Sequence, residues 1–198
     1  MTKWLFLFLL LALLALVACG GDSTPEVDPV WDALFVQEGM RVDTVGVRDL
    51  TQSDTLSDYP GVVIIDRQFT FQPGAEGGEV FAWEYYAQAL NPIKLIVVKF
   101  EESGEFIEII GESEMIVPEH KGLNRHVLHE PIPIALGCMM GLVQPQESAI
   151  PFRNLRGYKT LITARPFQRP LMRRDAFAMY GWRYALRVFW RQKEKDNS

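Results

Sequence analysis

The sequence lacks the compact motifs by which many enzymes are recognised. It has no Gly-x-Ser-x-Gly segment, no His-Glu-x-x-His pair and no glycine-rich phosphate loop. Each of these motifs fixes a nucleophile, a metal ligand or a phosphate cradle at a set spacing, so the chain carries no signature of α/β-hydrolases, zinc proteases or nucleotide-binding enzymes. We therefore expect no enzymatic activity and no cofactor.

Cysteine is also scarce, because only Cys19 and Cys138 occur among 198 residues. Two cysteines cannot form a framework of several disulfides. Cys138 lies in an apolar run, residues 134–143, where a free thiol is usually a small buried side chain rather than a nucleophile. We expect Cys138 to be buried and unpaired.

The N-terminus combines one positive charge, at Lys3, with an uncharged apolar run over residues 4–18. This run is shorter than the about 20 apolar residues that a membrane-spanning helix needs, and it has the flanks of a secretory signal. It ends in Leu16-Val17-Ala18-Cys19, which resembles the lipobox of bacterial lipoproteins. The resemblance implies cleavage between Ala18 and Cys19, with diacylglycerol and an acyl chain such as palmitate on Cys19. An ordinary cleaved signal and an uncleaved anchor are the alternatives.

By this resemblance residues 1–18 are a signal peptide, and the mature chain is held at a membrane of the cell envelope by lipid on Cys19. Gly20 and Gly21 stand where an Asp would be associated with retention in the inner membrane, which favours the outer membrane in a cell with two. Residues 19–30 are rich in Gly, Pro and Asp and predict a short lipid-anchored linker. Residues 193–198 predict a polar tail.

Charge is unevenly distributed along the mature chain. Residues 153–198 hold 12 Lys or Arg against 3 Asp or Glu, whereas residues 19–152 carry a net charge of −15. One interpretation is a basic surface for an anionic partner, and the other is mutual neutralisation within one folded domain. We do not expect nucleic acid as a partner, because the lipid anchor places the chain out of its reach.

Residues 31–192 are expected to form one domain, because from residue 62 onward short β-branched and aromatic runs are separated by turn residues. Residues 31–50 are the least readable part. The predicted strands are residues 62–65, 68–72, 80–87, 93–100, 106–110, 126–129, a segment ending at 143, 158–164 and 183–190. In residues 80–87 a period of two places Phe81, Trp83 and Tyr85 on one face. The many strands and the near absence of helical patterning favour an all-β fold, a single antiparallel β-sandwich.

Residues 176–191 are ambiguous between strand and helix. Arg183, Arg187 and Arg191 are spaced by four residues and would also line one face of a helix. We favour a strand over residues 183–190, because apolar residues alternate with the arginines. These apolar residues are Tyr184, Leu186, Val188 and Trp190.

Between residues 60 and 190 the order of elements is similar to that of secreted jelly-roll β-sandwich domains. The segments that carry the similarity are residues 78–87, 93–100, 106–111, a turn at 122–124, a Pro-Ile-Pro entry at 131–134 and a strand at 141–143. The resemblance implies a jelly-roll-like sandwich of the kind that binds carbohydrate or protein, or serves as a structural module.

Three histidines, His120, His126 and His129, lie close together in the sequence. On a strand, positions 126 and 129 point to opposite faces, so this pair cannot chelate a metal ion without a bulge or turn. We therefore expect no metal site.

Two groups of residues are candidates for ligand binding. Trp83 and Tyr85 offer faces on which a sugar ring stacks, although aromatic residues of a sandwich more often fill its core. Four arginines stand around two prolines, which predicts an exposed loop that clamps phosphate or carboxylate groups of a glycan or lipid headgroup, or else packs on the acidic part of its own domain. They are Arg165, Arg169, Arg173 and Arg174.

Together these patterns predict a non-catalytic envelope lipoprotein whose β-sandwich binds a glycan or a protein partner. A structural or assembly lipoprotein of an envelope complex is the alternative, and a hydrolase on the same fold is the third and least favoured interpretation.

Overall fold

The structure, a computed structural model, describes residues 31, 33–35, 42–53, 55–56, 61–71, 77–157, 160–163, 166–179 and 181–192. The chain divides into two compact units, Met1–Glu38 and Gly39–Ser198. In the described part of the first unit the rings of Trp31 and Phe35 lie 5.5 Å apart. The predicted signal peptide, linker and polar tail lie outside the described residues. No helix in the described parts of the chain has both the length and the apolar character needed to cross a bilayer.

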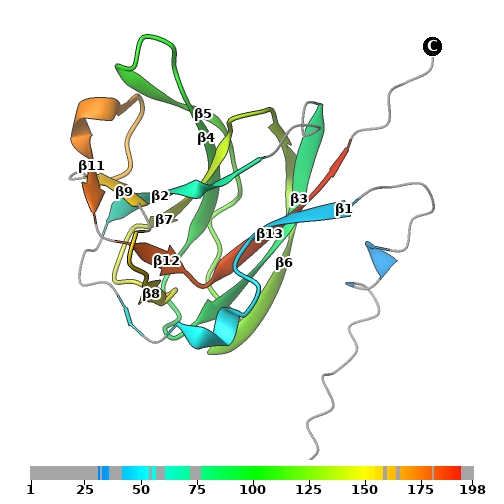
Figure 1. Ribbon diagram of the computed structural model, residues 1–198. Coiled ribbons are helices and arrows are strands. Elements are labelled where there is room, and N and C mark those ends of the chain that lie inside the picture. Colours follow the sequence, from blue (N-terminus) through cyan, green and yellow to red (C-terminus); the bar gives the residue numbers. More distant parts are fainter. Residues whose placement is uncertain are drawn as a thin grey trace, which may run out of the picture. The chain divides into compact units, whose positions relative to one another are not determined.

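The second unit is all-β, and every strand pair described in it is antiparallel. Its strands are β1 (Val42–Gly46), β2 (Val62–Thr70), β3 (Gly78–Ala87), β4 (Lys94–Phe100), β5 (Phe106–Glu112), β6 (Gly122–Ile134), β7 (Met139–Gln144), β8 (Phe152–Asn154), β9 (Thr160–Thr163), β10 (Leu171–Met172), β11 (Ala176–Met179), β12 (Trp182–Tyr184) and β13 (Leu186–Gln192). One sheet has the order β1-β13-β3-β6, a second has the order β10-β5-β4-β7-β2-β9-β11, and β12 pairs with β8 (Figure 1). The predicted all-β class with antiparallel sheets is confirmed.

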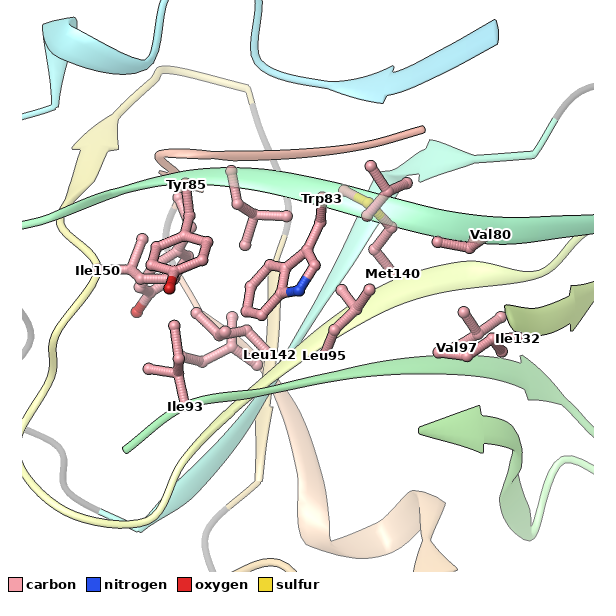
Figure 2. Packing of buried hydrophobic residues seen from close by; sticks show 14 of the residues in the cluster. Val80, Trp83, Tyr85, Ile93, Leu95, Val97, Ile132, Met140, Leu142 and Ile150 are labelled. Carbon is pink, nitrogen blue, oxygen red and sulfur yellow. The ribbon is translucent and has the colours of Figure 1, made fainter. Parts of the chain in front are cut away.

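The two larger sheets bury a common cluster of apolar side chains between them. Trp83 and Tyr85 project into it from β3, and Leu95 and Leu142 approach from β4 and β7 (Figure 2). Cys138 belongs to this cluster as a buried free thiol, as predicted. The cluster therefore joins the four-stranded sheet to one face of the seven-stranded sheet.

The seven-stranded sheet is curled, and its two edge strands are joined by one short segment of the chain. Its edge strands β10 and β11 are consecutive pieces of the chain, separated only by the 3₁₀ turn η2 (Arg173–Asp175). A second apolar cluster lies on the face of this sheet that points away from the four-stranded sheet. It contains Val63, Ile65, Ile96, Val98, Ile107, Met139, Val143, Leu161, Leu171 and Ala176. Burial on both faces explains why β4, β7 and the first four residues of β2 are nearly continuous apolar runs in the sequence.

The prediction that Phe81 shares a face with Trp83 and Tyr85 is wrong. Between β3 and β6, Val80 pairs with Ile132 whereas Ala82 pairs with Val127, so four residues of β6 lie opposite the single residue Phe81. This bulge breaks the period of two. Val80 takes the core position, and Phe81 lies outside the core cluster with the Arg191 guanidinium 5.2 Å from its ring centroid.

The C-terminal segment is extended, as predicted, and forms β11, β12 and β13. The four alternating apolar residues all enter the common core, and they are Tyr184, Leu186, Val188 and Trp190. Strand β13 lies between β1 and β3, so it is an interior strand of the four-stranded sheet. Its apolar alternation is that of a strand with one buried face.

The predicted turn at residues 122–124 is instead the start of β6, and the turn before it depends on Asn124. The Asn124 side-chain oxygen accepts hydrogen bonds from the backbone N–H groups of Glu119 (3.0 Å) and His120 (3.4 Å). Its amide nitrogen donates to the carbonyls of His120 (2.8 Å) and Gly122 (2.9 Å). A buried amide thus has all four of its bonding sites occupied.

We expect the substitution Asn124→Ala to lower the free energy of unfolding by about 2 kcal/mol, because it leaves several backbone groups of this turn without partners. Urea unfolding followed by circular dichroism measures the change. Asn154→Ala, at an exposed position of β8, is the matched control and should unfold like the parent protein. Equal stability of the two variants would show that Asn124 does not hold the turn.

Candidate functional site

The aromatic residues predicted to stack on a sugar lie inside the domain. Trp83 is 0% and Tyr85 2% exposed, and their rings are 4.5 Å apart within the common core. Burial also raises the pKa of the Tyr85 hydroxyl. The rings fill the core, which is the second of the two interpretations that the sequence allowed. A ligand cannot stack on them while the two sheets remain packed (Figure 2).

The structure does not gather the arginines of the predicted loop into one site. Arg165 lies outside the described residues. Arg169 forms an ion pair with Glu112 (2.9 Å) and lines a hollow beside β5. Arg173 donates to the carbonyl of Ala176 (2.9 Å) and, with the exposed Arg174, lines a different hollow. Arg169 and Arg173 thus bond to residues of their own domain. The arginines that are neighbours in the sequence line two separate hollows.

The three histidines are not assembled into a metal site in the described residues, where no cluster of three potential ligands occurs. The Nε2 atom of His126 lies 2.6 Å from a carboxylate oxygen of Glu114. The same oxygen accepts a hydrogen bond from the backbone N–H of His129 (3.3 Å). This carboxylate therefore ties the loop after β5 to strand β6.

A buried carboxylate lies at the centre of the four-stranded sheet. Glu84 of β3 pairs across the sheet with Arg125 of β6 and with Arg187 of β13. Nε of Arg125 donates to one carboxylate oxygen (2.9 Å), and Nε of Arg187 donates to the other (2.6 Å). Glu84 is 1% exposed, so both charges on its flanks are needed to offset its loss of hydration. We interpret this triad as a structural element.

A polar groove is the strongest candidate site in the described part of the chain. Three segments meet there: the turn after β1 with the 3₁₀ turn η1 (Leu50–Gln52), strand β8 with the residue after it, and strand β12. Its lining residues are Val47, Arg48, Asp49, Gln52, Ser53, Arg153, Leu155 and Arg183. We call it the arginine groove, and its volume is about 290 Å³. These segments lie together at the lower left of the domain in Figure 1.

Backbone pairing between distant parts of the chain builds the arginine groove. Thr55 and Phe152 exchange backbone hydrogen bonds of 3.3 and 2.7 Å, which hold the end of the first segment against β8. Gly46 brings the other end close to β13, because a Cβ atom there would lie 2.4 Å from the Cα atom of Arg187. The rings of Phe152 and Trp182 stack at 4.2 Å and fix β8 on β12.

The groove is positively charged, because Arg48, Arg153 and Arg183 outnumber the single carboxylate of Asp49. Nη1 of Arg153 donates to the side-chain oxygen of Gln52 (2.6 Å), which is a neutral acceptor. The Arg183 guanidinium lies 5.0 Å from the ring centroid of Phe69. Arg48 is exposed, and within the described residues its side chain has no hydrogen bond or ion pair. Its guanidinium is thus available to a ligand.

The one carboxylate of the groove is held ionised by its neighbours. One oxygen of Asp49 accepts from the hydroxyl (2.7 Å) and the backbone N–H (3.0 Å) of Thr51, and the other accepts from the amide of Gln52 (2.7 Å). The Thr51 hydroxyl and backbone N–H hold the pKa of the Asp49 carboxyl below its ordinary value. Asp49 is therefore not a proton donor near neutral pH.

We expect the substitution Thr51→Val to raise the pKa of Asp49, because the strongest of these bonds is lost. Since the folded-state pKa is the lower one, the carboxylate favours the folded state above its ordinary pKa, and this contribution is lost as pH falls through the folded-state value. An NMR titration of the Asp49 carboxyl carbon in both proteins measures the two midpoints. Identical midpoints would contradict the role given to Thr51.

The sequence did not indicate the arginine groove. Residues 31–50 were the least readable part of the sequence, and Arg153 was considered only as one charge of the basic C-terminal part. Gln52 and Arg153, which are bonded in the structure, are 101 positions apart. The overall excess of basic residues after position 152 was the sequence signal that included Arg153 and Arg183 of this groove. Comparison of the chain with protein-family models, with curated proteins and with solved structures finds no match.

Proposed function

We propose that the chain is an envelope lipoprotein, acylated on Cys19, whose jelly-roll-like β-sandwich binds a glycan or protein partner without catalysing a reaction. The resemblance of residues 16–19 to a lipobox supports the anchoring. Two antiparallel sheets on either side of one apolar cluster support the sandwich. In a cell with two membranes, we place the protein at the outer one.

The arginine groove is the observation that carries the binding function. Its side chains are groups that recognise ligands through hydrogen bonds and charge: three guanidiniums, an amide, a hydroxyl and an ionised carboxylate. Asp49 is engaged with Thr51 and Gln52, so the groove offers no protonated acid for general acid catalysis at neutral pH. Binding is the chemistry that these groups support best.

A glycan array tests the binding function directly. The full-length chain, kept in detergent, should bind a defined set of glycans, and the double variant Arg48→Gln with Arg153→Gln should lose that binding while it unfolds at the same temperature. Lys121→Gln, which removes one exposed positive charge outside the groove, is the control. Binding that survives in the double variant would show that the partner uses another surface.

Mass spectrometry of the protein from its native cell tests the anchoring. We expect an N-terminal Cys19 that carries diacylglycerol and an amide-linked acyl chain. An unmodified Cys19 thiol, or a protein that still contains Lys3, would contradict the lipoprotein assignment.

An assembly role is the second candidate, and a different feature favours it. Leu123 and Val127 lie on β6, an edge strand of the four-stranded sheet, and are 42% and 43% exposed. Exposed apolar residues on a sheet edge are typical of surfaces that contact another protein. If this role is correct, an envelope protein should co-purify in a fixed ratio, and Leu123→Ser with Val127→Ser should release it.

A further inference from the structure

We propose that the arginine groove holds a single acidic sugar residue, whose anionic group lies against Arg48 and Arg153 and whose hydroxyls face Asp49. This inference rests on the proposed function and specifies the ligand of the same site. The recognised chemistry is one anionic group on a hydroxylated ring. A uronic acid and a sugar phosphate both supply it.

The anionic group is inferred from Arg48 and Arg153, whose guanidinium groups, in the part of the chain that the structure describes, still have N–H donors free for a ligand. A guanidinium has five N–H donors in a planar fork that matches a carboxylate or a phosphate. Arg153 uses Nη1 on Gln52, a neutral acceptor, and the Arg48 side chain has no partner within the described residues. Arg183, held near Phe69, adds a third positive charge to the same groove. An anion is the ligand that such a surface attracts most strongly.

The hydroxylated ring is indicated by the remaining lining residues. One carboxylate oxygen of Asp49 accepts two bonds from Thr51, and the other accepts only that from Gln52, so it can still accept from a ligand hydroxyl. Val47 and Leu155 supply apolar surface for the C–H groups of a sugar. The negative charge of Asp49 disfavours a second anionic group beside the first.

The size of the groove limits how much of the ligand it encloses. Its volume of about 290 Å³ lies just below the range of about 300–1,000 Å³ that is usual for small-molecule sites. We therefore place one sugar residue inside the groove, with any further residues of a glycan extending along the surface.

Isothermal titration calorimetry of the full-length chain in detergent tests the ligand class. The probes are methyl glucuronide, glucose 6-phosphate, methyl glucoside and inorganic phosphate, each at low and at physiological salt. We expect at least one acidic sugar to bind about tenfold or more tightly than both methyl glucoside and inorganic phosphate, with weaker binding at higher salt. Tighter binding of methyl glucuronide would identify a carboxylate as the anionic group, and tighter binding of glucose 6-phosphate would identify a phosphate.

Single variants locate the ligand. Arg48→Gln and Arg153→Gln should each weaken binding of the acidic sugar by about tenfold or more, because each removes a charge-assisted pair of hydrogen bonds. Arg153→Lys keeps the charge without the fork and should give an intermediate loss. Lys121→Gln, the charge-matched control, should bind like the parent protein. Both arginines are exposed, so unchanged melting temperatures show that a loss of binding is local.

Three results would overturn the inference: equal binding of methyl glucoside and the acidic sugars, no saturable binding of either acidic sugar at millimolar concentration, or parent-like binding by both arginine variants. The proposed function fails differently. If the glycan array shows neutral glycans bound through the groove, the ligand class is wrong and the binding function stands. If no glycan and no protein binds and Cys19 is unmodified, the proposed function itself is wrong.

Discussion

Replacement of Trp83 by alanine should lower the free energy of unfolding by about 3–5 kcal/mol, the usual effect of emptying the space of a fully buried large aromatic side chain. Trp83 is completely buried between the sheets, against the ring of Tyr85 (Figure 2). Chemical denaturation followed by circular dichroism measures the loss. Because the ring does not line the arginine groove, variant protein that remains folded should bind the groove's ligand as the parent does.

The variant Trp83→Phe separates packing from polarity at the same position. Within the described residues the buried indole N–H of Trp83 has no hydrogen-bond acceptor. Phenylalanine loses part of the ring volume but also removes this unpaired donor, whose burial is unfavourable. We expect it to cost only about 1–2 kcal/mol. A loss as large as that of Trp83→Ala would show that the indole N–H has a partner that stabilises the fold.

Replacement of Glu84 by glutamine should be the second largest effect, at about 2–3 kcal/mol. The change leaves Arg125 and Arg187 facing a neutral amide in the middle of the four-stranded sheet. A fully buried pair would lose more, but the two arginine side chains are 33% and 31% exposed and regain part of their hydration.

Glu108→Gln is the matched control for Glu84→Gln, because Glu108 lies at an exposed position of β5. Its stability should remain within about 0.5 kcal/mol of that of the parent protein. The cycle of Glu84→Gln with Arg187→Gln then measures how much of the loss belongs to this pair. Additive losses would mean that the carboxylate and the guanidinium do not interact energetically.

The fold class was predictable because the interior strands are long and strongly apolar. Residues 93–100 and 106–110 were predicted as strands within a few residues of β4 and β5. Strands β8 and β10 were missed, since two or three residues are too few to show a period of two. The face of Phe81 was mispredicted, because the bulge that turns it depends on additional residues in β6, some fifty positions away.

The curl of the seven-stranded sheet was not predictable either. An apolar run such as Ile64–Ile65 is compatible with any interior strand. It does not indicate that other apolar side chains pack against both faces of the sheet. The arginine groove was missed for a related reason. Its three segments are brought together by the pairing of β8 with β12 and by the central place of β13, which are long-range consequences of topology.

The central place of β13 also decides when the domain can fold. Residues 186–192 follow every other described strand along the chain, yet they pair with β1 on one side and with β3 on the other. Without them, β1 has no neighbour among the described strands of its sheet, and the core lacks Leu186, Val188 and Trp190. The strands that precede β13 therefore cannot complete the four-stranded sheet by themselves, and β13 closes this sheet and its core in one step.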